Sequence, residues 1–283
     1  MPSPQNLLDV RDLEMQRPWL LRWLPPRLAG AVAWHFYRPR REQWLALYDD
    51  APLRFTPQCR MALLPGDVIS DRIAFSGVYD LPLSRHLMRR AAGGGAMIEI
   101  GANLGYFSLL WASAHPANRC YSFEASPPIA ERLRQNIERN NLGSRIEVIP
   151  LAAGKESGSV AFDIGPPDQT GWGGITLANA GSVITVDVVR VDEVLRYSGP
   201  ISFLKIDVEG ADTWALMGCE RLFRERRVKE VWFEQNRPRM RNLGIADGEA
   251  QAYLESLGFS LTPQGDPASD TVDWLATLRE DRT

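Results

Sequence analysis

The sequence predicts an α/β protein with a mainly parallel β-sheet, helices on both faces of the sheet, and an N-terminal extension. Strand-like and helix-like segments alternate across residues 97–236, as in parallel strands joined by right-handed crossovers. The clearest unit is Met97–Phe107, where a short apolar run meets a turn of small residues and then an apolar helical pattern. Acidic residues also follow several strand-like runs. These features indicate a sheet that binds a nucleotide-like ligand at its carboxyl edge.

Length and composition limit the function classes. The chain has 283 residues, of which 45% are hydrophobic and 24% charged, with a formal net charge of −3 and a pI near 5.8. It is long enough for one large α/β domain with an extension, and its charge argues against a sequence-independent nucleic-acid binder. The scattered cysteines, Cys59, Cys120 and Cys219, indicate a reducing compartment and neither a disulfide framework nor a zinc site.

Residues 1–50 are expected to form a helical N-terminal arm, separate from a main domain over residues 51–283. Met1–Gln16 is polar, and the apolar run Trp19–Leu24 contains an arginine and stops at two prolines, so we expect neither a signal peptide nor a membrane span. The cytoplasm is therefore the expected compartment. The sequence allows a homo-oligomer but does not set the oligomeric state.

The arm combines arginine with tryptophan. Between Gln16 and Leu45 there is one acid, Glu42. The arginines and tryptophans of this stretch are Arg17, Arg22, Arg27, Arg38, Arg40, Arg41, Trp19, Trp23, Trp34 and Trp44. Such a composition is typical of a helix at a membrane interface. The alternative is that the aromatic side chains pack the arm onto the main domain while the arginines face solvent.

The main domain is expected to begin with a β-rich lead-in over residues 51–80, with strands at Leu53–Thr56, Arg60–Leu64 and Val68–Tyr79. The core, residues 81–283, is expected to start with a helix over Leu81–Ala92. Further helices are predicted after Ser126, over Ala211–Cys219 and over Asp247–Leu257, and further strands over Cys120–Phe123, Arg145–Leu151, Ile201–Asp207, Val228–Glu234, Phe259–Leu261 and Thr271–Leu278.

Residues 158–189 interrupt the alternation of strands and helices. Ser159–Ile164 and Ser182–Val189 read as strands on either side of a loop rich in glycine and proline, Pro166–Gly174. A long loop beside a binding site is usually functional or mobile. We interpret it as a flap on the substrate side, with a plain connecting loop as the alternative.

The turn after the first core strand indicates which ligand binds. A dinucleotide site requires G-x-G-x-x-G, but here the second glycine is replaced by Asn103, between Gly101 and Gly105. Glu99, on the strand beside the turn, would repel a pyrophosphate and suits a ligand with an ammonium and a sulfonium group. S-adenosylmethionine (SAM) is such a ligand.

A second acid lies 23 residues after Gly101. Glu124 ends the run Cys120–Phe123, where a neighbouring parallel strand would present a carboxylate to ribose hydroxyls. The small residues Ala152–Gly154, after the third strand, would let an adenine ring lie against the backbone. The alternative is a structural glycine turn with a surface glutamate.

Three more acids are expected to meet on the reaction side. Asp207 and Glu209 share a face of an extended strand, and Glu234 ends the next one. One of them could accept the proton of a substrate hydroxyl, or Asp207 and Glu209 could hold Mg²⁺ that acidifies it. No other metal ligand is expected. Alternatively, the acids bind turn amides or pair with Lys205 and arginines.

These residues together resemble the FkbM-type SAM-dependent methyltransferases. The resemblance covers about residues 68–262 and rests on Ile98–Ser108, Phe123–Glu124, Leu204–Ala211 and Glu234. It implies a class I (Rossmann-like) methyltransferase fold with a seven-stranded sheet, and commonly O-methylation. It also implies cofactor-binding positions, at Tyr79, Glu99, Gly101, Asn103, Gly105, Tyr106, Phe107, Glu124, Ala125, Ala152 and Asp207, and reaction-side positions, at Asp207, Glu209 and Glu234.

The resulting hypothesis is a SAM-dependent O-methyltransferase whose acceptor is a sugar, a glycolipid or another small secondary metabolite. N-methylation of an amine is the alternative within the same chemistry. Two alternatives from other classes are a nicotinamide-dependent oxidoreductase, disfavoured by the missing glycine, and a catalytically silent SAM-binding scaffold, disfavoured by the retained acids. The resemblance does not reach the arm, whose peripheral membrane contact is a separate expectation.

Overall fold

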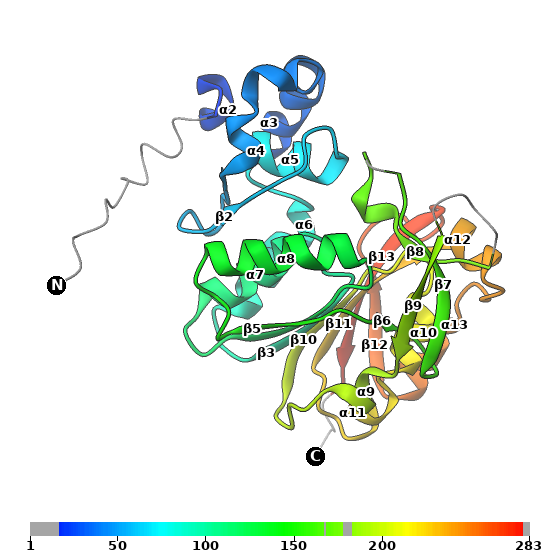
Figure 1. Cartoon of the computed structure of the whole chain (residues 1–283). Coiled ribbons are helices and arrows are strands. Elements are labelled where there is room, and N and C mark those ends of the chain that lie inside the picture. The colour runs from blue at the N-terminus through cyan, green and yellow to red at the C-terminus, as the bar shows by residue number, and fades with distance from the viewer. Residues whose placement is uncertain (1–16, 167, 178–182, 280–283) are drawn as a thin grey trace.

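The computed structural model describes residues 17–166, 168–177 and 183–279. Its centre is a seven-stranded sheet covered on both faces by helices (Figure 1). In spatial order the strands are β12 (Phe259–Pro263), β13 (Thr271–Leu278), β11 (Glu230–Asn236), β10 (Ile201–Ile206), β3 (Ala96–Ile100), β4 (Arg119–Phe123) and β5 (Ile146–Ile149). Only β13 runs antiparallel to its neighbours. The predicted seven-stranded, mainly parallel sheet is confirmed.

The strand order reverses between β3 and β10, because the chain moves outward from β3 to β5 and then returns to β10 on the other side. Ligands of open α/β sheets bind beyond the carboxyl ends of the strands at such a switch point. The fold thus places Gly101, which follows β3, beside Asp207, which follows β10. A hydrogen bond from Asp207 N to Ile100 O (3.0 Å) ties the two strand ends together.

Each face of the sheet has its own apolar core. Along β3, Met97 packs with one cluster, and its neighbours Ile98 and Ile100 pack with the other. The first face is covered by α6 (Leu81–Ala91), α7 (Tyr106–Ala114) and α8 (Pro127–Arg139). The second is covered by α9 (Val191–Val194), α10 (Asp212–Met217), α11 (Glu220–Arg224) and α13 (Glu249–Ser256), and α12 (Arg237–Asn242) follows β11. The predicted core helices and strands are thus present, with ends shifted by a few residues.

The predicted β-rich lead-in is wrong in two segments, because Leu53–Thr56 contains no strand and Val68–Ser76 is helical. The strands β1 (Ala51–Pro52) and β2 (Arg60–Met61) have only two residues each, and Val68–Ser76 forms helix α5 instead of a strand. Asp67 caps this helix by accepting a hydrogen bond from Ser70 N (2.8 Å), and Gly77 ends it with a left-handed backbone (φ 73°). These two caps, together with burial of one face, override the β preference of its valine, isoleucines and phenylalanine.

The described part of the arm is helical, as expected; its first sixteen residues lie outside the described ranges. It comprises α2 (Trp19–Trp23), α3 (Pro26–Val32), η1 (Ala33–Tyr37), η2 (Arg38–Trp44) and α4 (Ala46–Asp49). Leu21, Ala29 and Leu47 join the same apolar core as α5 and α7. Figure 1 shows these short helices and α5 gathered into a lobe at the top of the molecule. Across the described residues, no helix has the length and apolarity needed to cross a membrane.

A second, four-stranded sheet forms where the alternation of strands and helices breaks. Its order is β6 (Ala152–Ala153), β9 (Val183–Val189), β7 (Gly158–Asp163) and β8 (Gly174–Ile175), with a helical turn, η3 (Thr170–Trp172), before β8. The two predicted strands, β7 and β9, are confirmed, except that Ser182 lies outside the described residues. So does Pro167 of the predicted flap.

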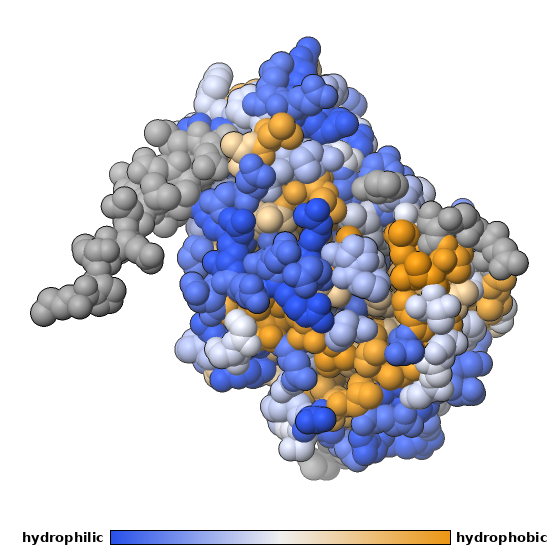
Figure 2. Space-filling model, in the orientation of Figure 1, coloured by the Kyte–Doolittle hydropathy of each residue, from blue (hydrophilic) through white to orange (hydrophobic). Residues whose placement is uncertain are grey.

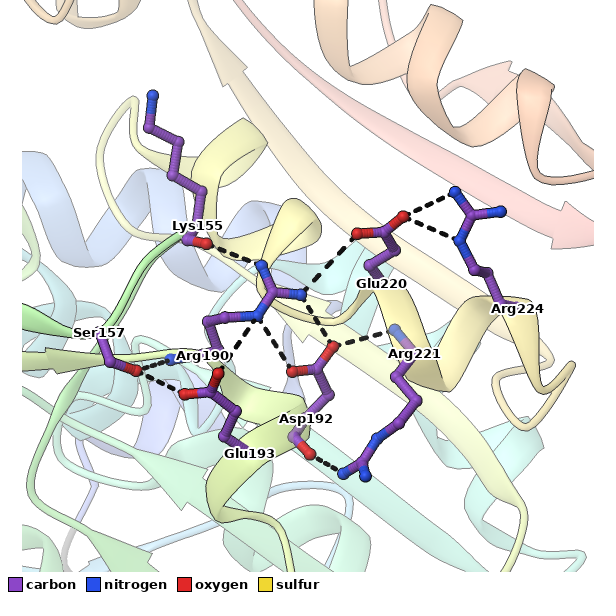
Figure 3. A network of polar contacts seen from close by, with 8 residues as sticks. All are labelled: Lys155, Ser157, Arg190, Asp192, Glu193, Glu220, Arg221 and Arg224. Atoms are coloured by element: carbon purple, nitrogen blue, oxygen red, sulfur yellow. Dashed lines mark hydrogen bonds and ion pairs between the residues drawn. The ribbon is translucent and has the colours of Figure 1, made fainter.

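A polar network fixes the base of this small sheet to the main domain (Figure 3). Arg190 donates a hydrogen bond to Lys155 O (2.7 Å) and pairs with Asp192 (3.0 Å) and Glu220 (3.9 Å). Asp192 in turn accepts a hydrogen bond from Arg221 N at the start of α11 (2.9 Å). The network holds the small sheet beside the carboxyl edge of the large one, so that its loop arches over that edge.

Candidate functional site

One cavity of about 290 Å³ lies at the carboxyl edge of the main sheet, at the switch point between β3 and β10. Its floor comes from the ends of β3, β4 and β10, and its roof from α5 and the loop at η3. Of the predicted site residues, those that line it are Tyr79, Glu99, Gly101, Asn103, Tyr106, Phe107, Glu124, Ala125, Ala152, Asp207, Glu209 and Glu234. Gly105 is the exception.

The two glycines of the turn have different roles. A Cβ on Gly101 (φ 80°) would lie 1.9 Å from the carbonyl oxygen of Asp207, so the strand ends can approach only around a glycine. A Cβ on Gly105 (φ 92°) would lie 2.4 Å from Leu133 in α8. Gly105 therefore allows α7 to pack against α8, and it does not line the cavity.

Glu99 places a carboxylate at the bottom of the cavity. Its side chain is fully buried, and Ser108 donates a hydrogen bond to its Oε2. Oε1 has no hydrogen-bond partner among the described residues, and the Lys205 ammonium lies 3.8 Å from it. Burial raises the pKa of Glu99 to about 7, although the charge of Lys205 opposes this shift. A buried acceptor without a donor fits a ligand that brings an ammonium group.

Glu124 shapes the next part of the wall. Its carboxylate accepts hydrogen bonds from Asn103 N (2.8 Å) and Ser126 N (2.9 Å), which fixes the turn after β3 against the end of β4. Each carboxylate oxygen can accept a second hydrogen bond, so ribose hydroxyls can still bind there. The position matches the predicted ribose site.

Beyond Glu124 the cavity is apolar. Ala152 belongs to a small core cluster with Phe162, against which Ala125 and Ile175 pack. These four residues also line the cavity. An apolar part of the cavity beside Glu124 is compatible with the adenine ring that the sequence predicts at Ala152.

Aromatic rings form the wall between Glu99 and the acid cluster. The ring centroid of Tyr79 lies 6.3 Å from that of Tyr106 and 6.0 Å from that of Phe107. The Lys205 ammonium lies 5.2 Å from the centroid of the Phe107 ring. The negative faces of such rings attract cations. This wall is therefore compatible with a sulfonium centre.

Asp207, Glu209 and Glu234 meet as predicted: each offers a carboxylate oxygen within 4.8 Å of those of the other two. Asp207 pairs with Lys205 (3.4 Å), and Glu209 pairs with Arg239 (3.2 Å). Asn236 Nδ2 lies 3.3 Å from Glu209 Oε2 and 3.4 Å from Glu234 Oε1. The acids therefore converge on one another, and Asp207 and Glu209 also form the ion pairs that the structural alternative described.

The three acids in this cluster outnumber the two cations that pair with them, and the pKa values of Glu209 and Glu234 rise. Burial, then the charge of Asp207, raises the pKa of Glu209 to about 7 and that of Glu234 to about 10. Burial also raises the pKa of Asp273 to about 7 and that of Asp212 well above its usual value. At neutral pH Glu234 is thus protonated and can donate a hydrogen bond, while Glu209 is poised to exchange a proton.

The oxygen-rich donor set of the cluster suits Mg²⁺ in principle. However, Lys205 and Arg239 already supply positive charge to Asp207 and Glu209, the two residues predicted to hold the metal. The residues can therefore act without a metal ion.

Hydrogen bonds join the loop at η3 to Asp67, at the start of α5, and to Asn103 in the glycine turn. Asp67 accepts hydrogen bonds from Thr170 N (2.8 Å) and Thr170 Oγ1 (3.0 Å), and Asn103 Nδ2 donates to Thr170 Oγ1 (3.2 Å). Arg239 donates a hydrogen bond to Trp172 O (3.1 Å). The loop predicted as a flap is thus held over the cavity by both halves of the site.

Sequence reasoning missed several residues of this site. Asp67 and Arg72 line the cavity from α5, a segment that was expected to be a strand. The sequence does contain a signal for this helix, because Asp67 and Gly77 are typical capping residues separated by a length suited to a short helix. Asp273 was missed because its place opposite Glu234 depends on the pairing of β11 with β13, which no local pattern reveals.

Comparisons with known proteins agree with this geometry. A family model described as "Methyltransferase FkbM domain" matches residues 99–261. The chain is 27% identical over 205 residues to 31-O-demethyl-FK506 methyltransferase FkbM from Streptomyces tacrolimicus, covering 62% of this chain and 76% of that protein. It is 26% identical over 217 residues to methyltransferase sdnD from Sordaria araneosa, covering 65% and 82%.

Two solved structures also resemble the fold. An O-methyltransferase from Bacillus cereus in complex with SAH has a TM-score of 0.40 and 18% identity, covering 71% of this chain and 82% of that chain. The O-methyltransferase TomG from Streptomyces achromogenes has a TM-score of 0.42 and 14% identity, with the same coverage.

Proposed function

The chain belongs to the FkbM methyltransferase family and is a SAM-dependent methyltransferase; from this premise we propose that it methylates a hydroxyl group of its acceptor. One observation carries the proposal. A single cavity joins the glycine turn, beside which Glu99 Oε1 pairs with Lys205 at 3.8 Å but accepts no hydrogen bond, to a group of converging carboxylates at the ends of β10 and β11. Such a cavity can hold a cationic methyl donor at one end and a proton acceptor at the other.

The donor end fits SAM group by group. Glu99 Oε1 is the buried acceptor available to the ammonium, directly or through a water, Glu124 is available to the ribose hydroxyls, and Ala125 and Ala152 flank the adenine slot. SAM supplies the methyl group on a positively charged sulfur. The aromatic wall at Tyr79 and the surplus of carboxylates favour that positive charge over a pyrophosphate. This is the physical reason for preferring SAM to a nicotinamide coenzyme.

At the acceptor end, Asp207 and Glu209 are the candidates for the general base. Asp207 has a side chain 36% exposed and pairs with Lys205 (3.4 Å), which orients its carboxylate. Glu209 has a pKa of about 7 and faces the same space. A base works best when its pKa lies near the working pH, so Glu209 is the better matched proton acceptor and Asp207 the better placed orienting group.

O-methylation is preferred to N-methylation because the cluster offers a base. A hydroxyl must lose its proton as the methyl group arrives, and a positioned carboxylate contributes roughly 10²- to 10⁴-fold to such a step. The name of the relative from Streptomyces tacrolimicus also states an O-methyl acceptor position. We infer a sugar, a glycolipid or another hydroxyl-bearing metabolite as the acceptor class, by analogy with the family.

Calorimetry with SAM, S-adenosylhomocysteine and NAD tests the donor, and transfer of labelled methyl from SAM to matched hydroxyl and amine acceptors tests the reaction. We expect binding of both sulfur compounds, no binding of NAD, and label on the hydroxyl compounds only. Label on the amines alone would establish the N-methylation alternative. If turnover survives EDTA, the acids act without a metal ion. Turnover that is lost with EDTA and restored by Mg²⁺ would contradict this.

A further inference from the structure

The N-terminal arm exposes large apolar side chains to solvent. Trp23 is 84% exposed, Trp19 70% and Phe36 62%. The other exposed large apolar residues of the arm are Leu20, Leu28, Trp34 and Leu45. We call this set of seven side chains the arm surface. The alternative that the aromatics pack the arm onto the main domain therefore does not hold for Trp19 and Trp23. Trp44 packs against the core, and Trp34 is only 38% exposed.

The arm surface is also basic, in a protein whose net charge is negative. Arg27 and Arg40 are exposed beside it, and the Arg38 guanidinium stacks 4.0 Å from the Trp34 ring. No aspartate or glutamate occurs between Arg17 and Arg41. Figure 2 shows hydrophobic residues over α3 and α4 surrounded by hydrophilic ones. Exposed apolar groups interspersed with arginine are the features of a peripheral membrane-binding surface.

A second copy of the chain fits this surface poorly. A two-fold interface pairs the same patch with itself, so the arginines of one arm would meet those of the other. Arg17 is buried and Arg38 is paired with Asp71 (2.7 Å), but no acid between Arg17 and Arg41 balances Arg27 and Arg40, so these like charges would be buried together. A membrane with anionic lipids offers the opposite charge and an apolar layer at the same time.

The arm surface lies close to the cavity. The Arg72 guanidinium is 5.9 Å from the Trp34 ring, and Arg72 itself lines the cavity. The helices of the arm are short: α2 has five residues and α3 has seven. They can lie along an interface but not cross it, which would hold the cavity next to the lipid headgroups.

We propose that the arm surface docks the protein on an anionic membrane, with the tryptophans among the headgroups and the arginines on lipid phosphates. The enzyme then receives an acceptor whose hydroxyl group is carried on a lipid. This second statement rests on the proposed methyltransferase function, whereas membrane docking does not. The two can therefore fail separately.

Vesicle sedimentation with the full chain tests docking. We expect binding to vesicles of phosphatidylcholine with 30% phosphatidylglycerol, weakened by salt, and at least about tenfold weaker binding to phosphatidylcholine alone. Trp19→Ser combined with Trp23→Ser removes apolar contact, and Arg27→Glu combined with Arg40→Glu reverses charge. Each double variant should lose at least about tenfold in affinity.

The matched control is Arg119→Glu combined with Arg196→Glu, at the amino end of β4 and just after α9, which lies far from the arm in Figure 1. It makes the same charge change and should bind anionic vesicles like the wild type. Thermal unfolding and SAM calorimetry should be unchanged in all three double variants. A wild-type protein that ignores both vesicles, or arm variants that bind like the control, would overturn docking.

Sedimentation velocity tests the other possible occupant of the arm surface, a second copy of the chain. A wild-type dimer that becomes a monomer in the Trp19→Ser and Trp23→Ser variant, with no vesicle binding, would assign the arm surface to self-association and overturn the proposal. Vesicle binding without SAM binding would leave docking intact and defeat the proposed function. Equal transfer to lipid-borne and detached acceptors would defeat the lipid-borne acceptor alone.

Discussion

The Cα of Gly101 lies so close to Asp207 that a Cβ there would come within 1.9 Å of the Asp207 carbonyl oxygen. This approach joins the two halves of the site, because Gly101 begins the donor turn after β3 and Asp207 begins the acid cluster after β10. The hydrogen bond from Asp207 N to Ile100 O keeps them together. The position of the methyl donor and the position of the base are thus set by one backbone contact.

Gly101→Ala should therefore impair SAM binding. The new methyl group meets backbone and the residue keeps a left-handed φ of 80°, so the strand ends must separate and stability should fall by about 1–3 kcal/mol. We expect SAM affinity to drop by at least about tenfold, since tenfold corresponds to only about 1.4 kcal/mol. Gly143→Ala is the control, because nothing lies within 4 Å of its Cβ position. Equal SAM affinity of both variants in calorimetry would show that the approach is not needed.

Asp207→Asn should separate binding from turnover. The amide keeps the size of the side chain but loses the negative charge that faces the acceptor and pairs with Lys205. We expect SAM affinity to change by less than about threefold and kcat to fall roughly 10²- to 10⁴-fold. Calorimetry and methyl transfer measured on the same sample decide this. A parallel loss of both would assign Asp207 to donor binding or to structure.

The rate of methyl transfer should depend on pH through Glu209. Its pKa of about 7 means that it is largely protonated, and inactive as a base, below that pH. The rate should rise about tenfold per pH unit below 7 and level off above it. In Glu209→Gln this limb should disappear, with a lower rate at pH 8. If the variant keeps the wild-type profile, another group takes the proton.

Glu99 should make the folded protein less stable as the pH rises. Its folded pKa, about 7, lies above the ordinary value of 4.5, so folding favours the protonated form and its contribution to stability is full below about 4.5 and lost by about 7. Relative to Glu99→Gln, the wild type should lose about 3 kcal/mol between pH 4.5 and pH 8 in urea unfolding. Glu147→Gln, at the exposed position of β5, should show no such difference. A constant gap between wild type and Glu99→Gln would mean that Lys205 keeps Glu99 charged throughout.

Local patterns in the sequence sufficed for most of the fold. Apolar runs of four to six residues, each followed by small or acidic residues, marked β3, β4 and β10 and the place where their ends bind a ligand. Because side chains at the carboxyl ends of parallel strands share one edge, Glu99, Glu124 and Asp207 could be grouped before any coordinates were known. The missing second glycine likewise pointed to SAM.

What local patterns missed depends on tertiary contacts. The β preference of Val68–Ser76 gave way to the Asp67 and Gly77 caps and to burial, and with this helix came the roof residues Asp67 and Arg72. The exposure of Trp19 and Trp23 could not be read from composition, since the same residues could equally have been buried. The raised pKa of Glu234 arises from burial and then from four acids, three within residues 207–212 and the fourth, Asp273, on β13, which no spacing rule brings together.

A crystal structure of the protein with S-adenosylhomocysteine tests the central claim most directly. The account predicts adenine against Ala125 and Ala152, ribose hydroxyls on Glu124, and the ammonium on Glu99 directly or through one water, with the sulfur facing Asp207 and Glu209. A ligand bound outside this cavity, or one whose sulfur points away from both carboxylates, would contradict it.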